Sequence, residues 1–199
     1  MSSSASPSDI HIRLFEVRDA PSVTRIWVDG LEQTVQAASV FTRPLWRLLM
    51  EKLADHATSP NGDMGPDGAN LDRFWGSNGE GERDDRAIYI AESRDRVTGV
   101  VAVVGVCCVK RGEDEKDIPP AGYPVFSIWR MSVDERVRGT KIGTRLMSAA
   151  EDWARGKGGG KMTLITGNSI ASKFYRSIGY KTINFWKLRH EKELSVEIK

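Results

Sequence analysis

The segment VRGTKIGTRLM, residues 137–147, combines glycines with basic and hydroxyl side chains directly before an expected helix. The first N–H groups of a helix have no partner within it and lie at the positive end of its dipole, so a glycine-bearing loop exposes them to an anion. Phosphate is the expected anion. The loop residues suited to it, by close approach, hydrogen bonding or charge, are Arg138, Gly139, Thr140, Lys141, Gly143 and Thr144. The alternative is a basic helix start whose glycines only serve the turn.

Two other phosphate-binding patterns are missing from the chain. A Walker A loop needs G-x-x-x-x-G-K-[ST] and a dinucleotide fingerprint needs G-x-G-x-x-G, and neither occurs. Nucleoside triphosphatase and Rossmann-type functions are therefore not expected.

Hydrophobic periodicity predicts a mixed α/β (α+β) domain around this loop. Alternating residues and apolar runs predict strands over 10–17, 87–93, 97–109, 123–133, 161–166 and 180–190. Apolar residues at steps of three and four predict helices after Pro21, after Pro44, at the loop itself and at Asn168 or Ser169. The apolar stripe of the second helix consists of Leu45, Leu48, Leu49 and Leu53.

One helix separates the expected strands 123–133 and 161–166. Such a crossover makes the two strands parallel, with a right-handed connection. Their C-terminal ends then lie at the same edge of the sheet, and the helix that follows the loop starts there. Because open α/β sheets receive ligands at this edge, we expect the anion to bind there.

Composition excludes several classes of protein. Twenty-nine basic and twenty-seven acidic residues give a net charge of +2, so no global attraction to nucleic acid or to an anionic membrane is expected. The apolar run 97–109 is shorter than a bilayer span and the N-terminus lacks the apolar core of a signal peptide, which predicts a soluble cytoplasmic protein. Adjacent Cys107 and Cys108 would face opposite sides of a strand, and the three histidines are scattered, so we expect no disulfide and no metal site.

The chain is expected to form a single domain over residues 10–199, after a serine-rich disordered tail at 1–9. Residues 56–85 are polar and glycine-rich and predict an inserted loop. Its larger apolar residues are Leu71, Phe74 and Trp75. They could anchor the loop or form a lid, and a solvated loop is the alternative.

Two motifs about thirty residues apart carry a family resemblance. The first, R/Q-x-x-G-x-G/A before a helix, is matched by Arg138 and Gly143, with Lys141 where the middle glycine usually stands. The second, N-x(6)-Y-x-x-x-G-[FY], is matched in order and spacing by Asn168, Tyr175, Gly179 and Tyr180. With the order of elements, these motifs resemble the GCN5-related N-acetyltransferase (GNAT) superfamily. The segments IRLF, AES, VTGVVAVVGV and RMSV are most similar to the camello-like members.

The resemblance implies the GNAT fold, a mixed sheet of about six strands flanked by about four helices. Strands 123–133 and 161–166 would splay apart around acetyl-CoA, used as co-substrate without a metal. The implied coenzyme contacts are Met131, Ser132, Val133, Arg138, Gly139, Thr140, Lys141, Ile142, Gly143, Thr144, Asn168 and Ser172. The implied reaction is direct attack of an amine on the thioester, with a main-chain N–H near Val133 polarising the carbonyl. Tyr175 would protonate the departing thiolate, and a core aromatic is the alternative for this residue.

The residue that deprotonates the amine is not indicated, because 123–133 contains no Asp or Glu. A water relay is expected, with Glu92 as a carboxylate candidate that could equally be a surface residue. Two other functions remain open, a non-catalytic acyl-CoA sensor and a domain that binds a phosphorylated partner.

The acceptor is expected to be an amine-bearing small molecule or a protein or peptide amine. Its specificity would be set by the early helices around residues 21–55 and by the 56–85 insert. Trp27, Trp46 and Trp75 could line an apolar acceptor pocket, and a core position is the alternative for Trp27. No nucleic acid partner is expected, and either a monomer or a homodimer is compatible with the resemblance.

Overall fold

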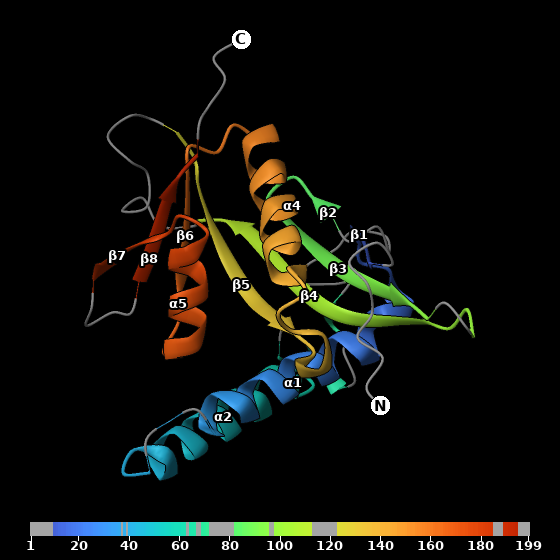
Figure 1. The fold of residues 1–199 in the computed structure, drawn as a ribbon, viewed down its shortest axis with the longest axis vertical. Coiled ribbons are helices and arrows are strands. Elements are labelled where there is room, and N and C mark those ends of the chain that lie inside the picture. The colour runs from blue at the N-terminus through green and yellow to red at the C-terminus, as the bar shows by residue number, and fades with distance from the viewer. Residues whose placement is uncertain are drawn as a thin grey trace.

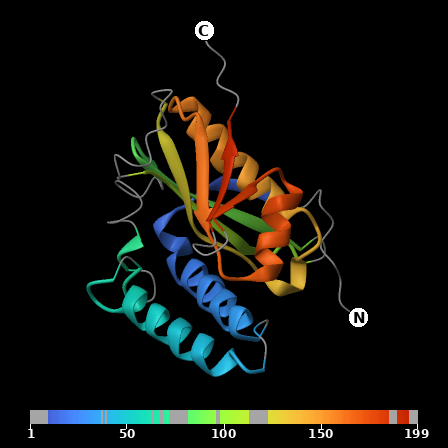
Figure 2. The same cartoon turned by 90° about the vertical axis from the view of Figure 1, so that its left-hand side faces the viewer.

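A mixed β-sheet with helices against both faces forms the fold (Figure 1 and Figure 2). The computed structural model describes residues 10–36, 38, 40–62, 64–66, 69–71, 82–95, 98–112, 123–184 and 189–194. The elements in chain order are β1 (Ile10–Leu14), η2 (Val17–Asp19), α1 (Ala20–Gln36), α2 (Arg43–Thr58), β2 (Glu82–Arg83), β3 (Arg86–Arg94), β4 (Val101–Arg111), β5 (Val125–Val133), η5 (Glu135–Val137), α4 (Ile142–Gly156), β6 (Lys161–Ile165), α5 (Ser169–Ser177), β7 (Lys181–Asn184) and β8 (Arg189–Glu193).

The described strands lie in the order β1-β3-β4-β5-β6-β8-β7, and β2 pairs with the start of β3. The pairing of β5 with β6 is parallel, as expected for two strands joined through the single helix α4. The other described pairs are antiparallel, including the expected hairpin of β3 and β4. The predicted mixed α/β class is therefore confirmed.

The expected number of strands and the expected C-terminal strand are wrong in detail. Within the described ranges the sheet has eight strands, whereas about six were expected, because β2 adds a short strand and the segment 180–190 is not one strand. It contains β7 and the start of β8, which pair as a hairpin, and β8 lies beside β6. The sequence between these strands has no Gly or Pro, so the pattern does not indicate the turn.

Strands β5 and β6 pair over only three residues each, Val125–Ser127 with Lys161–Thr163. A hydrogen bond of 2.8 Å between the hydroxyls of Ser127 and Thr163 marks the last pair. Beyond it β5 continues to Val133, and Figure 1 shows it running away from β6. From residue 128 onward, the edge of β5 that faces β6 thus has no strand beside it among the described residues, which is the splay implied by the resemblance.

Two hydrophobic clusters cover the two faces of the sheet. One lies beneath α4 and α5 and includes Phe126 and Leu146, and the other lies beneath α1 and includes Ile26. Cys107 belongs to the first cluster and Cys108 to the second, which confirms that these neighbours face opposite sides. Both cysteines are buried, and neither forms a disulfide with a described residue.

Helix α1 passes very close to the end of β5. A Cβ on Gly30 would come within 2.5 Å of the Ser132 hydroxyl oxygen, so any larger residue would force that hydroxyl to move. The Ser132 hydroxyl donates a hydrogen bond of 3.0 Å to the carbonyl of Ile26. These contacts fix α1 over the end of β5, the strand that separates from β6.

A buried carboxylate holds α4 against the C-terminal hairpin. Glu151 of α4 accepts hydrogen bonds from Lys192 at 2.8 and 2.9 Å and from the Tyr180 hydroxyl at 3.2 Å. Burial, with a smaller effect of the Glu151 charge, raises the pKa of Tyr180. The hydroxyl of Tyr180 therefore stays protonated and donates to the carboxylate.

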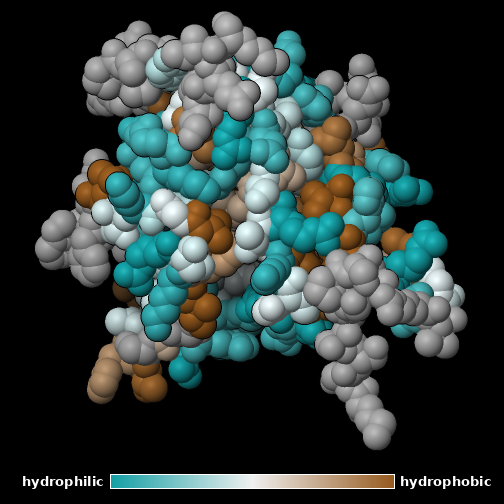
Figure 3. Space-filling view, turned by 45° about the horizontal axis from the view of Figure 1, so that its top comes forward, coloured by the Kyte–Doolittle hydropathy of each residue, from teal (hydrophilic) through white to brown (hydrophobic). Residues whose placement is uncertain are grey.

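The second helix is present but does not bury its predicted stripe. Helix α2 packs along α1 and buries Met50 and Ala57, whereas the four leucines of the stripe are exposed. Phe41, at the α1–α2 connection, is exposed as well. Figure 3 shows brown side chains at its lower left, on the side where Figure 1 places α2.

The expected insert at 56–85 begins within α2 and is partly packed. Ala57, Met64 and Leu71 are buried in the cluster beneath α1, so Leu71 anchors the segment as one interpretation had it. Phe74 and Trp75 lie outside the described residues.

No helix among the described residues is long and apolar enough to cross a membrane.

Replacing an exposed leucine of α2 should cost little stability. Leu48 is 52 % exposed, and its change to Ser should alter the free energy of unfolding by no more than about 0.5 kcal/mol in denaturant titrations. The control Leu146→Ala removes a fully buried side chain and should cost about 2–5 kcal/mol. An equal loss in both variants would mean that the leucine face of α2 is covered in the folded protein.

Candidate functional site

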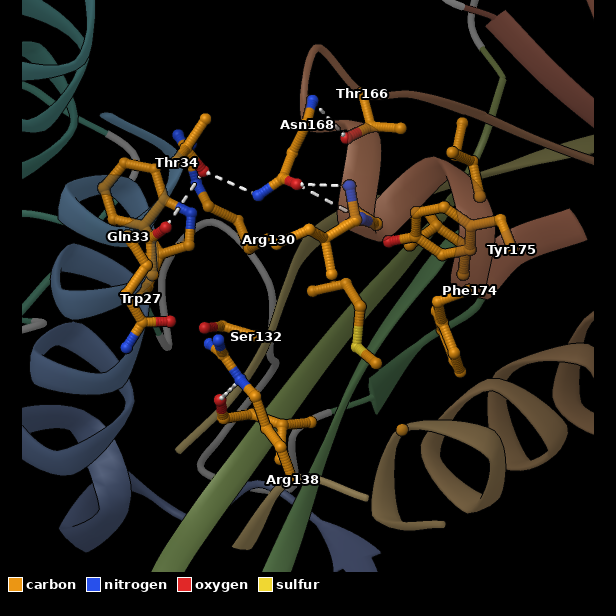
Figure 4. Close-up of a pocket in the computed structure, with 18 of the residues that line it drawn as sticks. Trp27, Gln33, Thr34, Arg130, Ser132, Arg138, Thr166, Asn168, Phe174 and Tyr175 are labelled. Carbon is orange, nitrogen blue, oxygen red and sulfur yellow. Dashed lines mark hydrogen bonds between the residues drawn. The ribbon is translucent and has the colours of Figure 1, made fainter. Parts of the chain in front are cut away.

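A cavity of about 580 Å³ opens where β5 and β6 part. Its walls come from α1, from the end of β5, from residues 137–144 with the start of α4, and from the end of β6 with the start of α5. In Figure 4, Trp27 and Gln33 face the cavity from one side, and Phe174 and Tyr175 face it from the other.

Most of the residues predicted from the sequence come together around this cavity. Those that line it are Met131, Ser132, Val133, Arg138, Gly139, Lys141, Ile142, Gly143, Thr144, Asn168 and Tyr175. Thr140 and Ser172 are not among the lining residues. The Thr140 hydroxyl donates to the carbonyl of Val137 at 2.6 Å, and the Ser172 hydroxyl forms a hydrogen bond of 3.2 Å with Nε2 of His190.

The loop before α4 leaves the start of that helix without a side-chain cap. Lys141 precedes the helix in a left-handed conformation, with φ of 65°, and the first turn of α4 has no acidic residue. Gly139 also has a positive φ, of 80°, so it serves the turn as the alternative interpretation held. The first N–H groups of α4 have no partner within the helix and lie beside the cavity.

Gly143 has a second, packing role. A Cβ on this residue would lie 3.2 Å from the ring of Phe174 and 3.3 Å from the end of Met131. Glycine here therefore lets α4 approach α5 and β5 closely. The sequence motif alone does not separate this role from close approach of an anion.

Asn168 is confirmed as the cap of α5. Its side-chain oxygen accepts hydrogen bonds from the N–H groups of Ile170 and Ala171, at 2.8 and 3.2 Å. Its amide nitrogen donates to the Thr34 hydroxyl at 3.3 Å (Figure 4). One side chain thus ties the start of α5 to α1 across the cavity.

Tyr175 is both a core residue and a wall of the cavity. Its ring packs near those of Phe174 and Tyr180, at centroid distances of 5.2 and 5.9 Å, and the residue is only 6 % exposed. Figure 4 shows its hydroxyl directed toward the cavity. Burial, with a smaller effect of Cys107, raises the pKa of Tyr175, so the phenol stays protonated at neutral pH.

Arg130 lines the cavity and was not identified from the sequence. It is the extra residue of a β-bulge in β5, with an unusual positive φ of 48°, and its guanidinium lies 4.1 Å above the ring centre of Trp27. Strict alternation would place Arg130 beside Phe126 and Ile128 in the core. A charge on that apolar face is the sequence signal of the bulge.

The two other tryptophans considered for the acceptor pocket differ from Trp27. Trp27 is buried and lines the cavity. Trp46 of α2 lies outside the lining and packs against Gly167, where a Cβ would come within 2.2 Å of its ring. Trp75 lies outside the described residues.

Glu92 lies away from the cavity. Its carboxylate accepts a hydrogen bond of 2.6 Å from Arg13, which also pairs with Asp19 at 2.7 Å. Glu92 is therefore ion-paired outside the cavity lining, which does not fit the role of a base. Within the described part of the chain, no group of three or more His, Cys, Asp or Glu side chains could hold a metal ion.

Comparisons with known proteins agree with this geometry. The acetyltransferase (GNAT) family matches residues 50–180. The fold is similar to that of the PaiA N-acetyltransferase from Thermoplasma acidophilum in complex with coenzyme A, at 18 % identity and a TM-score of 0.54, covering 92 % of this chain and 98 % of that one. It is also similar to an acetyltransferase from Trypanosoma brucei, at 18 % identity and a TM-score of 0.53, covering 88 % and 95 % of the two chains.

A GNAT-family acetyltransferase from Staphylococcus aureus is similar as well, at 12 % identity and a TM-score of 0.55, covering 94 % of this chain and 99 % of that one. No curated protein sequence matches the chain. These comparisons support the superfamily expected from the sequence, and they do not support the camello-like subgroup.

His190, which holds Ser172 behind the cavity, should make stability depend on pH. Burial and the nearby Arg176 lower its pKa, whereas a histidine in the unfolded chain has a pKa of about 6.5. The unfolded state therefore binds a proton that the folded state resists, and stability should fall as pH drops below about 6.5.

The variant His190→Gln should lose part of this slope when unfolding is followed by denaturant between about pH 7.5 and pH 5. His56→Gln changes an exposed histidine and serves as the control, with the wild-type slope expected. Identical slopes for wild type and His190→Gln would contradict the assignment.

Proposed function

Because the chain belongs to the acetyltransferase (GNAT) family, we propose that it transfers an acetyl group from acetyl-CoA to a primary amine. The observation that carries the proposal is the edge of β5 from Ile128 to Val133 that faces away from β4 and pairs with no described strand. The main-chain carbonyl of Val133 accepts a hydrogen bond of 3.0 Å from Nε of Arg138. This edge runs along a cavity that continues to the uncapped start of α4. A strand edge and a helix start, joined by one cavity, suit a ligand with an amide-bearing arm and a diphosphate.

The residues along this path fit such a coenzyme. Main-chain groups of Met131, Ser132 and Val133 can pair with an extended arm as an added strand would. The N–H groups between Arg138 and Thr144 can bind a diphosphate, with further charge from Arg138 and Lys141. Coenzyme A in the similar Thermoplasma structure supports this proposal.

Acetyl-CoA, when bound, supplies the acetyl group as an activated thioester. In the proposed reaction the amine attacks directly, the C–N bond forms, the C–S bond breaks, and Tyr175 donates its proton to the thiolate. A main-chain N–H near Val133 polarises the acetyl carbonyl. The amine passes its surplus proton to water, because no described lining residue is Asp or Glu, and water returns a proton to the Tyr175 phenolate.

The position of Tyr175 supports its role as the acid. Its hydroxyl is directed into the cavity, and its ring packs near those of Phe174 and Tyr180. The raised pKa keeps the proton on the phenol until negative charge develops beside it. Asn168 contributes by holding α5, and hence Tyr175, at a fixed distance from α1.

Tyr175→Phe should lower kcat about 10²-fold or more without changing the affinity for coenzyme A, because the ring stays and only the proton donor is removed. The measurement is thiol release from acetyl-CoA across a panel of amines, with coenzyme binding followed by calorimetry. Tyr180→Phe is the matched control, since Tyr180 is buried beside Tyr175 but lies outside the cavity lining.

An unchanged kcat in Tyr175→Phe would remove Tyr175 from the mechanism. Tight coenzyme binding with no acceleration by any amine would instead favour the acyl-CoA sensor. Failure of coenzyme A to bind at all would contradict the proposal as a whole.

A further inference from the structure

The bulge in β5 adds a charged side chain to the α1 side of the cavity. Cys108 and Val106 of β4 face the cluster beneath α1 and pair with Trp129 and Ser132 of β5. Two residues of β5, Arg130 and Met131, therefore stand opposite one residue of β4, Cys107. Met131 packs against the cluster beneath α4, and Arg130 turns to Trp27 on the other face.

The guanidinium of Arg130 is held in a defined position. It stacks on Trp27, which is 5 % exposed and belongs to the packed face of α1. Stacking engages the face of the guanidinium, whereas its N–H donors lie in its plane and suit two oxygens of a carboxylate or phosphate. Arg130 extends across the centre of the cavity in Figure 4, apart from Arg138.

The charge of the described cavity wall is positive. Its charged lining residues are Arg130, Arg138 and Lys141. Arg138 and Lys141 belong to the loop before α4, where the proposed function places a diphosphate. Arg130 stands on the α1 side, over the ring of Trp27, so its charge lies apart from that loop and would attract a second anion there.

Gln33 supplies a neutral acceptor on the same side. Its Nε2 donates to Glu135 at 3.2 Å, and its Oε1 is buried without a hydrogen-bond partner among the described residues. A buried carbonyl oxygen of this kind is stabilised when it accepts an N–H. Figure 4 shows Gln33 beside Trp27 at the cavity, within the same wall as Arg130.

We propose that the acceptor of this enzyme is an amine that also carries an anionic group, and that Arg130, stacked on Trp27, binds that anion. This inference rests on the proposed acetyl transfer. Gln33 Oε1 accepts an N–H of the amine, and the rings of Trp27 and Trp129 contact its apolar part. The acceptor would thus be a primary amine that carries a carboxylate or a phosphate. A polycationic amine would be repelled by the positive charge of Arg130, Arg138 and Lys141.

The test compares amines that differ only in the anion. One pair is phenylalanine and phenethylamine, for the carboxylate, and the other is glucosamine 6-phosphate and glucosamine, for the phosphate. Spermidine serves as the polycation. We expect kcat/KM for the anionic member of at least one pair to exceed that of its partner by about tenfold or more, as for a hydrogen bond to a charged group.

Arg130→Met keeps about the length of the side chain and removes its charge. The ratio of kcat/KM between the anionic amine and its partner should then fall toward one, chiefly because KM for the anionic amine rises. Arg130→Lys should keep part of the ratio. Arg138→Met is the matched control, because the loss of this cation should weaken coenzyme binding and slow both members of a pair alike. A ratio near one in the wild-type enzyme, a ratio unchanged in Arg130→Met, or spermidine as the best acceptor would overturn the inference.

A binding measurement separates this inference from the proposed function. If no amine reacts, calorimetry of N-acetylphenylalanine and N-acetylphenethylamine with the coenzyme-bound protein still decides whether Arg130 prefers the anion. Preferential binding of the carboxylate, lost in Arg130→Met, would support the anion site even if acetyl transfer fails. Equal binding of the two compounds would overturn it.

Discussion

Strands β5 and β6 share hydrogen bonds over only three residues each. Past that point their facing edges separate, and each strand stays in the sheet through its other neighbour. On its other edge, β6 pairs with β8 along its whole length. β5 is held by β4 on one edge and by α1 across its face, where Gly30 allows the close approach to Ser132. On the side facing β6, no described strand pairs with β5 beyond Ser127, and the Arg138 side chain bonds only the Val133 carbonyl. The other main-chain groups of this edge can therefore bind water or a ligand, since buried main-chain groups are rarely left unpaired.

The residues around this edge combine structural and chemical roles. Asn168 caps α5 and also reaches α1, so the same side chain sets the width of the cavity. Tyr175 packs in the core beneath α5, and its hydroxyl faces the cavity. Gly143 leaves room for the ring of Phe174 and also lines the cavity at the start of α4. Such double use means that a substitution at this site changes both packing and chemistry, and a matched control is needed to separate them.

Periodicity and motif spacing predicted the fold class, the parallel pair and most of the cavity lining, because each depends on local pattern or on a helix between two strands. The C-terminal hairpin was missed since its turn carries no Gly or Pro. The exposure of the α2 leucines was missed because a helical stripe shows which residues share a face and not what covers that face. Arg130 was missed because a bulge arises from the pairing of β5 with β4, which a single strand does not reveal.

The central claim is that the free edge of β5 and the start of α4 together bind an acyl coenzyme A. Hydrogen–deuterium exchange with and without coenzyme A tests it directly at the main-chain amides concerned. The account predicts slower exchange over residues 128–133 and 138–145 on addition of the coenzyme, with no change in α2. Unaltered exchange in both segments, or protection confined to another part of the chain, would contradict it.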